Sequence, residues 1–280
     1  MEITVLIENT TIDEKLISEH GLSLLIENDN KKYLLDAGQT GVFMHNIEKM
    51  GVDASNVVCA VLSHGHYDHA GGFAQYLQHN SSVKVYAMEN ITHDYYSASG
   101  GNVHPIGVPE EVYPKYKSQF QLINQVTQID DDVYLIPHTT KGLEKIGERT
   151  KLYKMEDDKY VGDDFAHEVS LVFDTPKGLI IFNSCSHAGM ENIVEEVKEV
   201  FPGKKVYVFC GGLHMKGSRD GVEYCTFSDD EIYCLSEFVK SEKMHKLYTG
   251  HCTGAIGFEY LKEHLGEKIE QLSTGKSFNL

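Results

Sequence analysis

The 280-residue sequence lacks several features that would assign it to a common class of protein. No apolar run approaches the roughly 20 residues of a membrane-spanning helix, so we expect no membrane insertion. The first residues, Met1–Leu6, resemble a strand with an acidic residue rather than a basic leader, and we expect no export. The six cysteines lack Cys-x-x-Cys spacing, which argues against a zinc ribbon and favours free thiols in a reducing cytoplasm.

Basic residues are also scarce. The chain has 25 Lys and Arg against 42 Asp and Glu, a formal charge of −17, and no Lys or Arg run, which makes nucleic acid a poor partner. A small phosphorylated or carboxylated ligand still fits, because divalent ions can reverse the sign of the potential inside one cleft. We expect a small-molecule substrate, and the sequence is compatible with a homo-oligomer. At 41% hydrophobic residues, one domain over residues 1–280 is favoured.

One segment carries most of the recognisable chemistry. Residues 63–72 read Ser-His-Gly-His-Tyr-Asp-His-Ala-Gly-Gly and follow the apolar run Val57–Leu62. Imidazoles suit zinc, iron and other transition ions, and a carboxylate among them can help to hold a second ion. The metal-ligating side chains of this segment are His64, His66, Asp68 and His69.

The spacing of these residues has a physical reason. A strand that ends at Leu62 or Ser63 would direct His64 and His66 to one side of the following turn. We expect Asp68 to cap a helix from Ala70 to about His79. One turn could therefore serve two adjacent metal ions.

Hydrophobic patterning predicts an α/β chain. The middle stretch, about residues 90–150, is polar and rich in Gly, Pro and Tyr, and we interpret it as an irregular insertion with short strands. The expected strands are Ile3–Glu8, Leu22–Glu27, Lys32–Asp36, Val57–Leu62, Val83–Met88, Phe120–Gln125, Asp132–Pro137, Glu168–Asp174, Leu179–Asn183, Val206–Cys210 and Lys246–Thr249. The expected helices are Gly41–Met50, Ala70–His79, Met190–Phe201, Asp229–Ser241 and Ala255–His264.

The two halves of the chain resemble each other. The strand pair in residues 22–36 parallels the pair in residues 169–183, and the strand before His64 matches Val206–Cys210 before the Gly-Gly-Leu-His of residues 211–214. This similarity predicts two mixed sheets packed face to face with helices outside, an αββα sandwich.

The same residues resemble the metallo-β-lactamase superfamily over essentially the whole chain. The similar motifs are Leu34–Gly38, Ser63–Gly72 and Tyr248–His251. Five further segments are similar to proteins grouped as 7,8-dihydropterin-6-methyl-4-(β-D-ribofuranosyl)-aminobenzene-5′-phosphate synthase-like, a subgroup name that implies a pterin and a ribose phosphate. These segments are Glu19–Ser23, Gly38–Thr40, Ser184–Gly189, Gly211–His214 and Gly250–Gly254.

The resemblance implies two divalent metal ions, zinc in the first place, with iron and manganese as alternatives. It implies as ligands His64, His66, Asp68, His69, His251 and a later histidine. By register with the family pattern, Asp164 falls near the usual third-motif histidine and residues 185–187 near the bridging aspartate. We take His187 as the missing ligand and Asp164 as the alternative, and we expect Asp36 to orient a ligating imidazole or the turn. Cys185 and Cys252 are interpreted as packing residues beside these ligand segments.

The remaining candidates concern catalysis and substrate contact. His214 or Asp68 would help to move a proton. His20 and Asp164 are candidates for substrate contact, and Tyr95 and His104 of the middle stretch could offer faces to an aromatic ring. His138, His167 and His245 are interpreted as incidental.

These features predict a cytoplasmic metal-dependent hydrolase or transferase that acts on a small phosphorylated or pterin-like substrate through a metal-bound hydroxide. The alternative is a non-hydrolytic di-iron protein that binds or reduces oxygen or nitric oxide with the same ligands. A third hypothesis, a ligand-binding protein that has lost catalysis, is disfavoured by the intact set of His64, His66, Asp68, His69 and His251.

Overall fold

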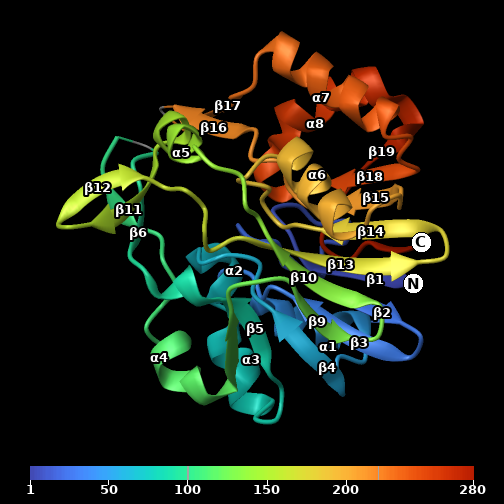
Figure 1. Ribbon diagram of the computed structural model, residues 1–280. Helices are drawn as coiled ribbons and strands as arrows, with labels where there is room; N and C mark the ends of the chain where they lie inside the picture. The colour runs from blue at the N-terminus through green and yellow to red at the C-terminus, as the bar shows by residue number, and fades with distance from the viewer. Residues whose placement is uncertain (100, 220) are drawn as a thin grey trace. The chain divides into compact units, whose positions relative to one another are not determined.

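The computed structural model describes residues 1–99, 101–219 and 221–280. The chain divides into two compact units. Unit 1 comprises residues 1–95, 106–124 and 272–280, and unit 2 comprises residues 96–105 and 125–271. Each unit contains one seven-stranded mixed sheet (Figure 1). A single domain over the whole chain stays a prediction.

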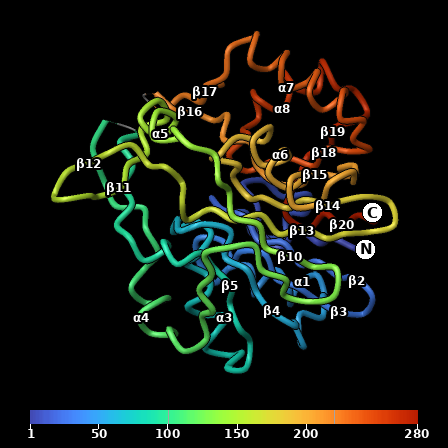
Figure 2. Tube along the Cα trace, in the orientation of Figure 1, coloured from blue at the N-terminus to red at the C-terminus, as the bar shows by residue number. Residues whose placement is uncertain are grey.

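The sheet of unit 1 joins both ends of the chain. Its strand order is β20-β1-β2-β3-β4-β5-β8, so the C-terminal strand pairs with the N-terminal one (Figure 2). The strands are β1 (Glu2–Ile7), β2 (Ser23–Asn28), β3 (Lys31–Leu35), β4 (Val57–Val61), β5 (Val85–Met88), β8 (Phe120–Ile123) and β20 (Ser277–Asn279). Strands β3, β4, β5 and β8 pair in parallel, and the central strands β4 and β5 are apolar and mostly buried, as expected for strands covered on both faces.

The helices of unit 1 are short. They are α1 (Val42–Met50), α2 (Tyr67–Ala70), α3 (Phe73–His79) and α4 (Tyr113–Tyr116), with 3-10 turns at Glu89–Thr92 and Lys117–Gln119. The predicted start of the helix over Ala70–His79 is wrong. The chain is already helical at Tyr67, this first turn (α2) ends at Ala70, and the remaining part is the separate helix α3. His66 is the N-cap of α2 and makes no side-chain cap bond, so Asp68 lies inside the helix and does not cap it.

The sheet of unit 2 has the order β19-β18-β15-β14-β13-β10-β9. Its strands are β9 (Thr127–Asp130), β10 (Val133–Pro137), β13 (Val169–Thr175), β14 (Gly178–Phe182), β15 (Val206–Cys210), β18 (Lys246–Thr249) and β19 (Ile269–Gln271). A four-stranded sheet of β12 (Lys159–Gly162), β11 (Leu152–Glu156), β6 (Tyr95–Ser97) and β7 (His104–Pro105) and a hairpin of β16 (Lys216–Arg219) and β17 (Val222–Cys225) complete the strands described.

Unit 2 contains the longest of the described helices. Its helices are α5 (Glu144–Thr150), α6 (Met190–Val200), α7 (Asp229–Ser241) and α8 (Gly254–Leu265), with 3-10 turns η3 (His251–Thr253) and η4 (Gly266–Lys268). Helices α7 and α8 lie side by side, and α8 also contacts β19 (Figure 1). Ser228 and Glu231 form a capping box at the start of α7, which satisfies backbone N–H groups that would otherwise lack partners.

The similarity between the two halves extends to the pairing of the strands. In unit 1 the sheet begins with three antiparallel pairs and continues from β3 with three parallel ones. In unit 2 the same succession runs from β9, with the parallel pairs beginning at β14. The Asp36 N–H donates to Val61 O at 2.8 Å, and the Asn183 N–H donates to Cys210 O at 3.1 Å in the matching place. The sequence repeat is therefore a repeat of topology.

The middle stretch, residues 90–150, supplies edge strands to both large sheets. It contains β8 of unit 1 and β9 and β10 of unit 2, together with α4 and α5. Two of its strands were expected from the sequence near residues 120–125 and 132–137. Among the described residues, none of the helices is both long and apolar enough to cross a bilayer.

Candidate metal centre

The metal-ligating residues of unit 1 follow the carboxyl ends of two parallel strands. Asp36 comes directly after β3, and residues 63–69 come directly after β4. Because neighbouring parallel strands end at the same edge of a sheet, these segments meet there, where open α/β sheets usually bind ligands. One potential ligand atom from each of Asp36, His64 and His69 lies within 4.8 Å of the other two.

Three imidazoles pack against one another in this segment. The ring centroid of His64 is 4.5 Å from that of His66 and 4.3 Å from that of His69. His64 and His69 are fully buried, and His66 is 5% exposed. Burying three polar imidazole rings side by side costs free energy that packing alone does not offset. The arrangement suits a set of metal ligands.

The buried carboxylate of Asp36 fixes the protonation pattern of two of these rings. Its Oδ2 accepts from Nδ1 of His69 at 2.7 Å and from the Ser63 hydroxyl at 2.7 Å, while Oδ1 accepts from the Ser63 N–H at 2.7 Å. Because the Ser63 hydroxyl donates to Asp36, its oxygen accepts from Nδ1 of His64 at 2.8 Å. When these two imidazoles are neutral, Nε2 of each carries the lone pair that a metal ion binds.

The electrostatics of unit 1 favour a positive charge at this position. Burial lowers the pKa of His69, but the negative charges of Asp68 and Asp36 and the hydrogen bonds to them outweigh burial and raise this pKa to about 10. An excess of negative charge that would otherwise hold a proton on a buried ring can instead hold a cation. The residues of unit 1 therefore fit a divalent metal ion.

Asp68 presents its carboxylate to two histidines of unit 1. Oδ2 lies 3.5 Å from Nε2 of His69 and 3.2 Å from Nε2 of His20. The His20 side chain is 47% exposed, whereas that of Asp68 is 10% exposed. Helix α2 is too short to be stable alone, so the position of Asp68 depends on the packing around it.

The two glycines that end the histidine segment are required by close backbone approach. A Cβ on Gly71 would lie 2.0 Å from Gln39 O, and one on Gly72 would lie 1.9 Å from Ala37 O. The Ala37 N–H in turn donates to His69 O at 2.9 Å. The Gly-Gly pair thus lets the segment that follows β3 pack against the metal-ligating turn.

In unit 2 the turn after β14 carries Cys185 and His187. Ser186 has a left-handed backbone, with φ of 53°. Its N–H donates to Asn183 Oδ1 at 2.8 Å, and its hydroxyl donates to Gly212 O at 2.7 Å. The turn is therefore held rigidly from both ends.

Glu168, the residue directly before β13, anchors the same turn through its carboxylate. It accepts from the His187 N–H at 2.8 Å and from the Ala188 N–H at 2.9 Å. Burial raises the pKa of Glu168 and outweighs the opposing effects of His138 and of these two donors. The His187 ring is stacked on Phe165, with centroids 4.8 Å apart and planes inclined by 11°. Sequence reasoning did not single out Glu168 or Phe165.

Two further histidines of unit 2 follow β15 and β18. His214 and His251 both have left-handed backbones, with φ of 47° and 50°. The rings of His187 and His214 lie 4.4 Å apart. Nδ1 of His214 is buried and has no hydrogen-bond partner among the described residues. Strained backbone at such positions is typical of functional sites.

Cys252 lies beside His251 with its sulfur bound to backbone groups. The sulfur accepts from the His214 N–H at 3.3 Å and donates to Cys185 O at 3.6 Å. Burial raises the pKa of the Cys252 thiol, but hydrogen bonds with Cys185 and His214 and the nearby imidazoles hold it well below its usual range.

Unit 2 also contains a buried histidine–aspartate pair that was not predicted from the sequence. Nε2 of His167 donates to Asp163 Oδ2 at 3.0 Å, and both side chains are fully buried. The adjacent candidate, Asp164, instead accepts from Lys154 at 2.7 Å with its side chain 31% exposed. The only signal in the sequence was the four-residue spacing between Asp163 and His167, which also suits an ordinary structural pair.

The weaker substrate candidates lie in different environments. Tyr95 is 2% exposed, and its hydroxyl donates to Asn90 O at 2.6 Å. His104 is exposed, and its Nδ1 donates to Asn102 O at 3.1 Å. Exposed His104 and half-exposed His20 are accessible to a ligand, whereas the ring of Tyr95 is buried.

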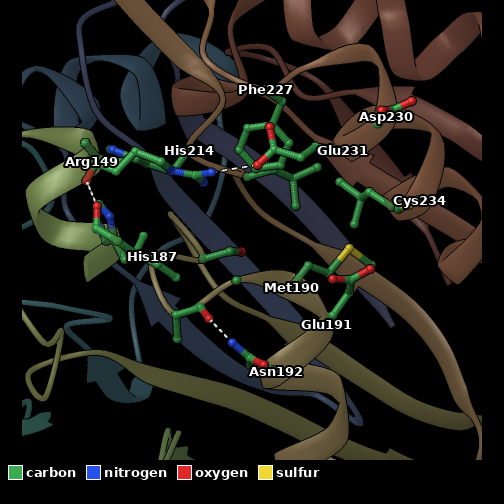
Figure 3. Close-up of a pocket in the computed structure, with 17 residues that line it drawn as sticks. Arg149, His187, Met190, Glu191, Asn192, His214, Phe227, Asp230, Glu231 and Cys234 are labelled. Atoms are coloured by element: carbon green, nitrogen blue, oxygen red, sulfur yellow. Dashed lines mark hydrogen bonds and ion pairs between the residues drawn. The ribbon is translucent and has the colours of Figure 1, made fainter. Parts of the chain in front are cut away.

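Unit 2 contains a cavity of about 340 Å³ beside His187 and His214 (Figure 3). Its apolar lining comes from Ile146, Met190, Leu213, Phe227 and Leu235. Arg149 lies at one side, paired with Glu231 at 2.6 Å and placed over the ring of Phe227 at 5.9 Å. The volume is within the range of small-molecule pockets, and the lining has the usual apolar wall with few polar groups.

Known proteins resemble this chain along most of its length. The family model of the metallo-β-lactamase superfamily matches residues 18–149. An uncharacterised protein of Methanocaldococcus jannaschii is 31% identical over 90% of each chain. The 7,8-dihydropterin-6-methyl-4-(β-D-ribofuranosyl)-aminobenzene-5′-phosphate synthase of the same organism is 27% identical over 92% of this chain and 89% of its own.

A solved structure resembles this chain over its whole length. Tm1679, a metal-dependent hydrolase of the β-lactamase superfamily, is 26% identical, with a TM-score of 0.81 over 100% of this chain and 99% of its own. The predicted fold class is thereby confirmed. The family match, the relatives and this structure agree, and the chain belongs to the metallo-β-lactamase superfamily.

Proposed function

We propose that the protein is a metal-dependent enzyme of hydrolase type that acts on a small molecule with two divalent ions. The observation that carries this proposal is the buried cluster of His64, His66 and His69, in which Asp36 is hydrogen-bonded to His69. Three adjacent buried imidazoles, one of them fixed by a buried carboxylate, are the donor set expected for a transition ion.

The proposed ligands are His64, His66, Asp68, His69, His187 and His251. Zinc suits these donors best, and iron and manganese are the alternatives. When bound, the ions would supply Lewis acidity and lower the pKa of water. Asp36 would keep the His69 ring in the tautomer and orientation that ligation needs.

Two residues of the chain are proposed to handle protons. His214 has a buried Nδ1 without a hydrogen-bond partner among the described residues, so this atom can accept or donate a proton when substrate is bound. Asp68 is 10% exposed at its side chain and is bonded to His20, which gives its carboxylate a route for proton exchange with solvent. His214 and Asp68 are therefore the proposed catalytic residues.

The cavity of unit 2 supports a substrate with an apolar or aromatic part. Its charged lining residues are Arg149, Glu191, Asp230 and Glu231. Because carboxylates outnumber the guanidinium, which is itself paired, a phosphate group is disfavoured there, and a ring is favoured against Phe227. A phosphorylated or pterin-like substrate, as the name of the synthase relative suggests, would place its ring in this cavity.

Other parts of the proposal concern contacts and location. His20, Asp164, Tyr95 and His104 are kept as candidates for substrate contact, with His20 and His104 the more accessible. We propose a cytoplasmic protein because its cysteines are free thiols. Nucleic acid is not a proposed partner, and a homo-oligomer is compatible with the proposal.

Elemental analysis of the untagged protein tests the proposal. We expect about two zinc or manganese ions per chain, followed by turnover in a panel of phosphoesters, thioesters and pterin derivatives. Two iron ions with oxygen or nitric oxide chemistry and no hydrolysis would support the di-iron alternative. Absence of tightly bound metal after reconstitution would contradict the proposal.

A further inference from the structure

We propose that Asn46 is a positioning residue: it holds the segment between β1 and β2 so that His20 meets the carboxylate of Asp68. The inference rests on the proposed function, in which Asp68 is a metal ligand. All three residues belong to unit 1, and Nε2 of His20 lies 3.2 Å from Oδ2 of Asp68. A partner that orients a ligating carboxylate strengthens metal binding, so the position of His20 matters for the site.

The segment that carries His20, residues 8–22, has neither helix nor strand. It meets the C-terminal part of unit 1 through an isolated bridge between Thr11 and Thr274. Ile12 is 64% exposed and Ile17 is 44% exposed, so these two side chains contribute little apolar burial. A long connection of this kind is mobile unless other groups hold it. The position of His20 therefore depends on hydrogen bonds from outside the segment.

Asn46 supplies three of these hydrogen bonds. Its side chain belongs to α1 and is fully buried. Nδ2 donates to Leu6 O at 2.9 Å and to Ile17 O at 2.8 Å, while Oδ1 accepts from the Ile17 N–H at 2.9 Å. Burying an amide is unfavourable unless its polar atoms are bonded, and a leucine of similar size would pack without that requirement. The amide thus ties both backbone groups of Ile17 to the end of β1.

The two neighbours of His20 are also fixed. Glu19 accepts from the Thr40 N–H at 3.0 Å and from the Thr40 hydroxyl at 2.8 Å. Gly21 has a φ of 138°, and a Cβ at this position would lie 2.3 Å from Asp68 O. Only glycine allows the segment to approach the metal-ligating turn so closely. His20 is therefore confined between a bonded carboxylate and a backbone contact.

Hydrogen–deuterium exchange tests the anchoring without metal or substrate. Exchange in residues 9–21 is followed by mass spectrometry in wild type, Asn46→Leu and Asn80→Ala. Loss of the bonds to Ile17 should speed exchange in this segment by roughly 10-fold or more, because local opening becomes easier. Asn80→Ala is the control, since Asn80 bonds to Tyr76 O at the end of α3 and should leave the segment unchanged. Equal exchange in wild type and Asn46→Leu would overturn the inference.

Zinc affinity tests whether Asn46 acts through His20. It is measured by competition with a chromogenic chelator for Asn46→Leu, His20→Ala and the double variant. We expect both single variants to bind zinc roughly 10–100-fold more weakly than wild type, and the double variant to bind no more weakly than His20→Ala. A purely structural role would give additive losses in the double variant. Additive losses, or wild-type affinity in Asn46→Leu, would overturn the positioning role.

The outcomes separate this inference from the proposed function. Failure of wild type to bind zinc would overturn the proposed function, while the exchange experiment would still decide whether Asn46 holds the segment. Zinc binding by wild type with unchanged exchange or unchanged affinity in Asn46→Leu would overturn the inference alone. If Asn46→Leu does not fold, as judged by thermal unfolding, Asn46→Asp carries the same tests, because it keeps the size of the side chain and loses the Nδ2 donor.

Discussion

Nδ1 of His69 donates to Oδ2 of Asp36 at 2.7 Å, and neither side chain is exposed to solvent. The two residues are 33 positions apart and follow different strands of the same sheet. The carboxylate also binds the backbone and the hydroxyl of Ser63, so it fixes the turn and the ring together. An imidazole held in this way is pre-organised for metal binding.

Asp36→Asn should weaken metal binding while the fold is kept. The amide preserves the size of the side chain but removes the charge that orients His69, and we expect roughly 10–100-fold lower zinc affinity. Competition with a chromogenic chelator measures this affinity. Asp53→Asn is the control, since the Asp53 side chain is 65% exposed and bonds to Lys32 and Ser55, neither of which is a proposed ligand. Equal affinities for the two variants would contradict the orienting role.

Asp68→Ala should abolish turnover without unfolding the chain. The substitution removes a proposed ligand and proton carrier, and we expect a loss in kcat of at least about 10²–10⁴-fold. Steady-state rates on the substrate found in the panel, together with a thermal unfolding curve, check both statements. Asp94→Ala changes an exposed carboxylate of the same unit and should retain activity. Full activity of Asp68→Ala would exclude its proposed role.

Gly72→Ala should destabilise the protein strongly. The added Cβ would lie 1.9 Å from Ala37 O and 2.5 Å from Thr40 O, both backbone atoms that cannot move without the chain. We expect a loss of about 3 kcal/mol or more in the free energy of unfolding, measured by urea denaturation. Gly107→Ala is the matched control, because its nearest contacts are ordinary at 3.6 Å. A similar stability for both variants would show that the loop relaxes.

Glu231 should stabilise α7 at neutral pH and lose this effect in acid. The Ser228 N–H and Arg149 lower the pKa of its carboxyl below the usual 4.5. A depressed folded-state pKa contributes stability above the unfolded value, and that contribution disappears as pH falls through the folded one. We expect wild type to exceed Glu231→Gln by about 1 kcal/mol at pH 7.

Urea denaturation of these two proteins at a series of pH values checks the sign. The difference in unfolding free energy should shrink steadily below pH 4.5, because both side chains are then neutral. Glutamine keeps the capping hydrogen bonds, so the comparison isolates the charge. A difference that grows in acid would contradict the expected direction.

Phe227→Ala should raise KM for aryl substrates with little change in kcat. The ring lines the cavity beside His214, and loss of an aromatic contact of about 0.5–1.5 kcal/mol corresponds to a roughly 2–12-fold rise in KM. Initial rates on an aryl substrate and on an alkyl analogue separate ring contact from general damage. Tyr233→Ala serves as the control, because this α7 residue is 54% exposed and lies outside the cavity lining. An equal effect on both substrates would argue against a ring-binding cavity.

The sequence by itself determined where most of the strands and helices lie along the chain, the repeat of the two halves and the family. Alternation of apolar residues and the spacing of the histidines are local properties, and a strand such as β4 or β15 begins within a residue of its expected position. The predicted start of the helix after β4 was wrong. The helix begins at Tyr67, because His66 and not Asp68 is its N-cap. The helical turn is set there by surrounding backbone contacts, not by a capping side chain.

Only the tertiary structure decided which groups meet within each unit. The bond between His69 and Asp36, the proximity of Cys185 to His251 and the cavity beside His214 depend on how the turns after separate strands fold against one another. Sequence patterns report the face on which a side chain lies, because backbone periodicity is local. Side-chain partners across a sheet edge depend instead on strand order and loop conformation, which arise from packing of the whole unit.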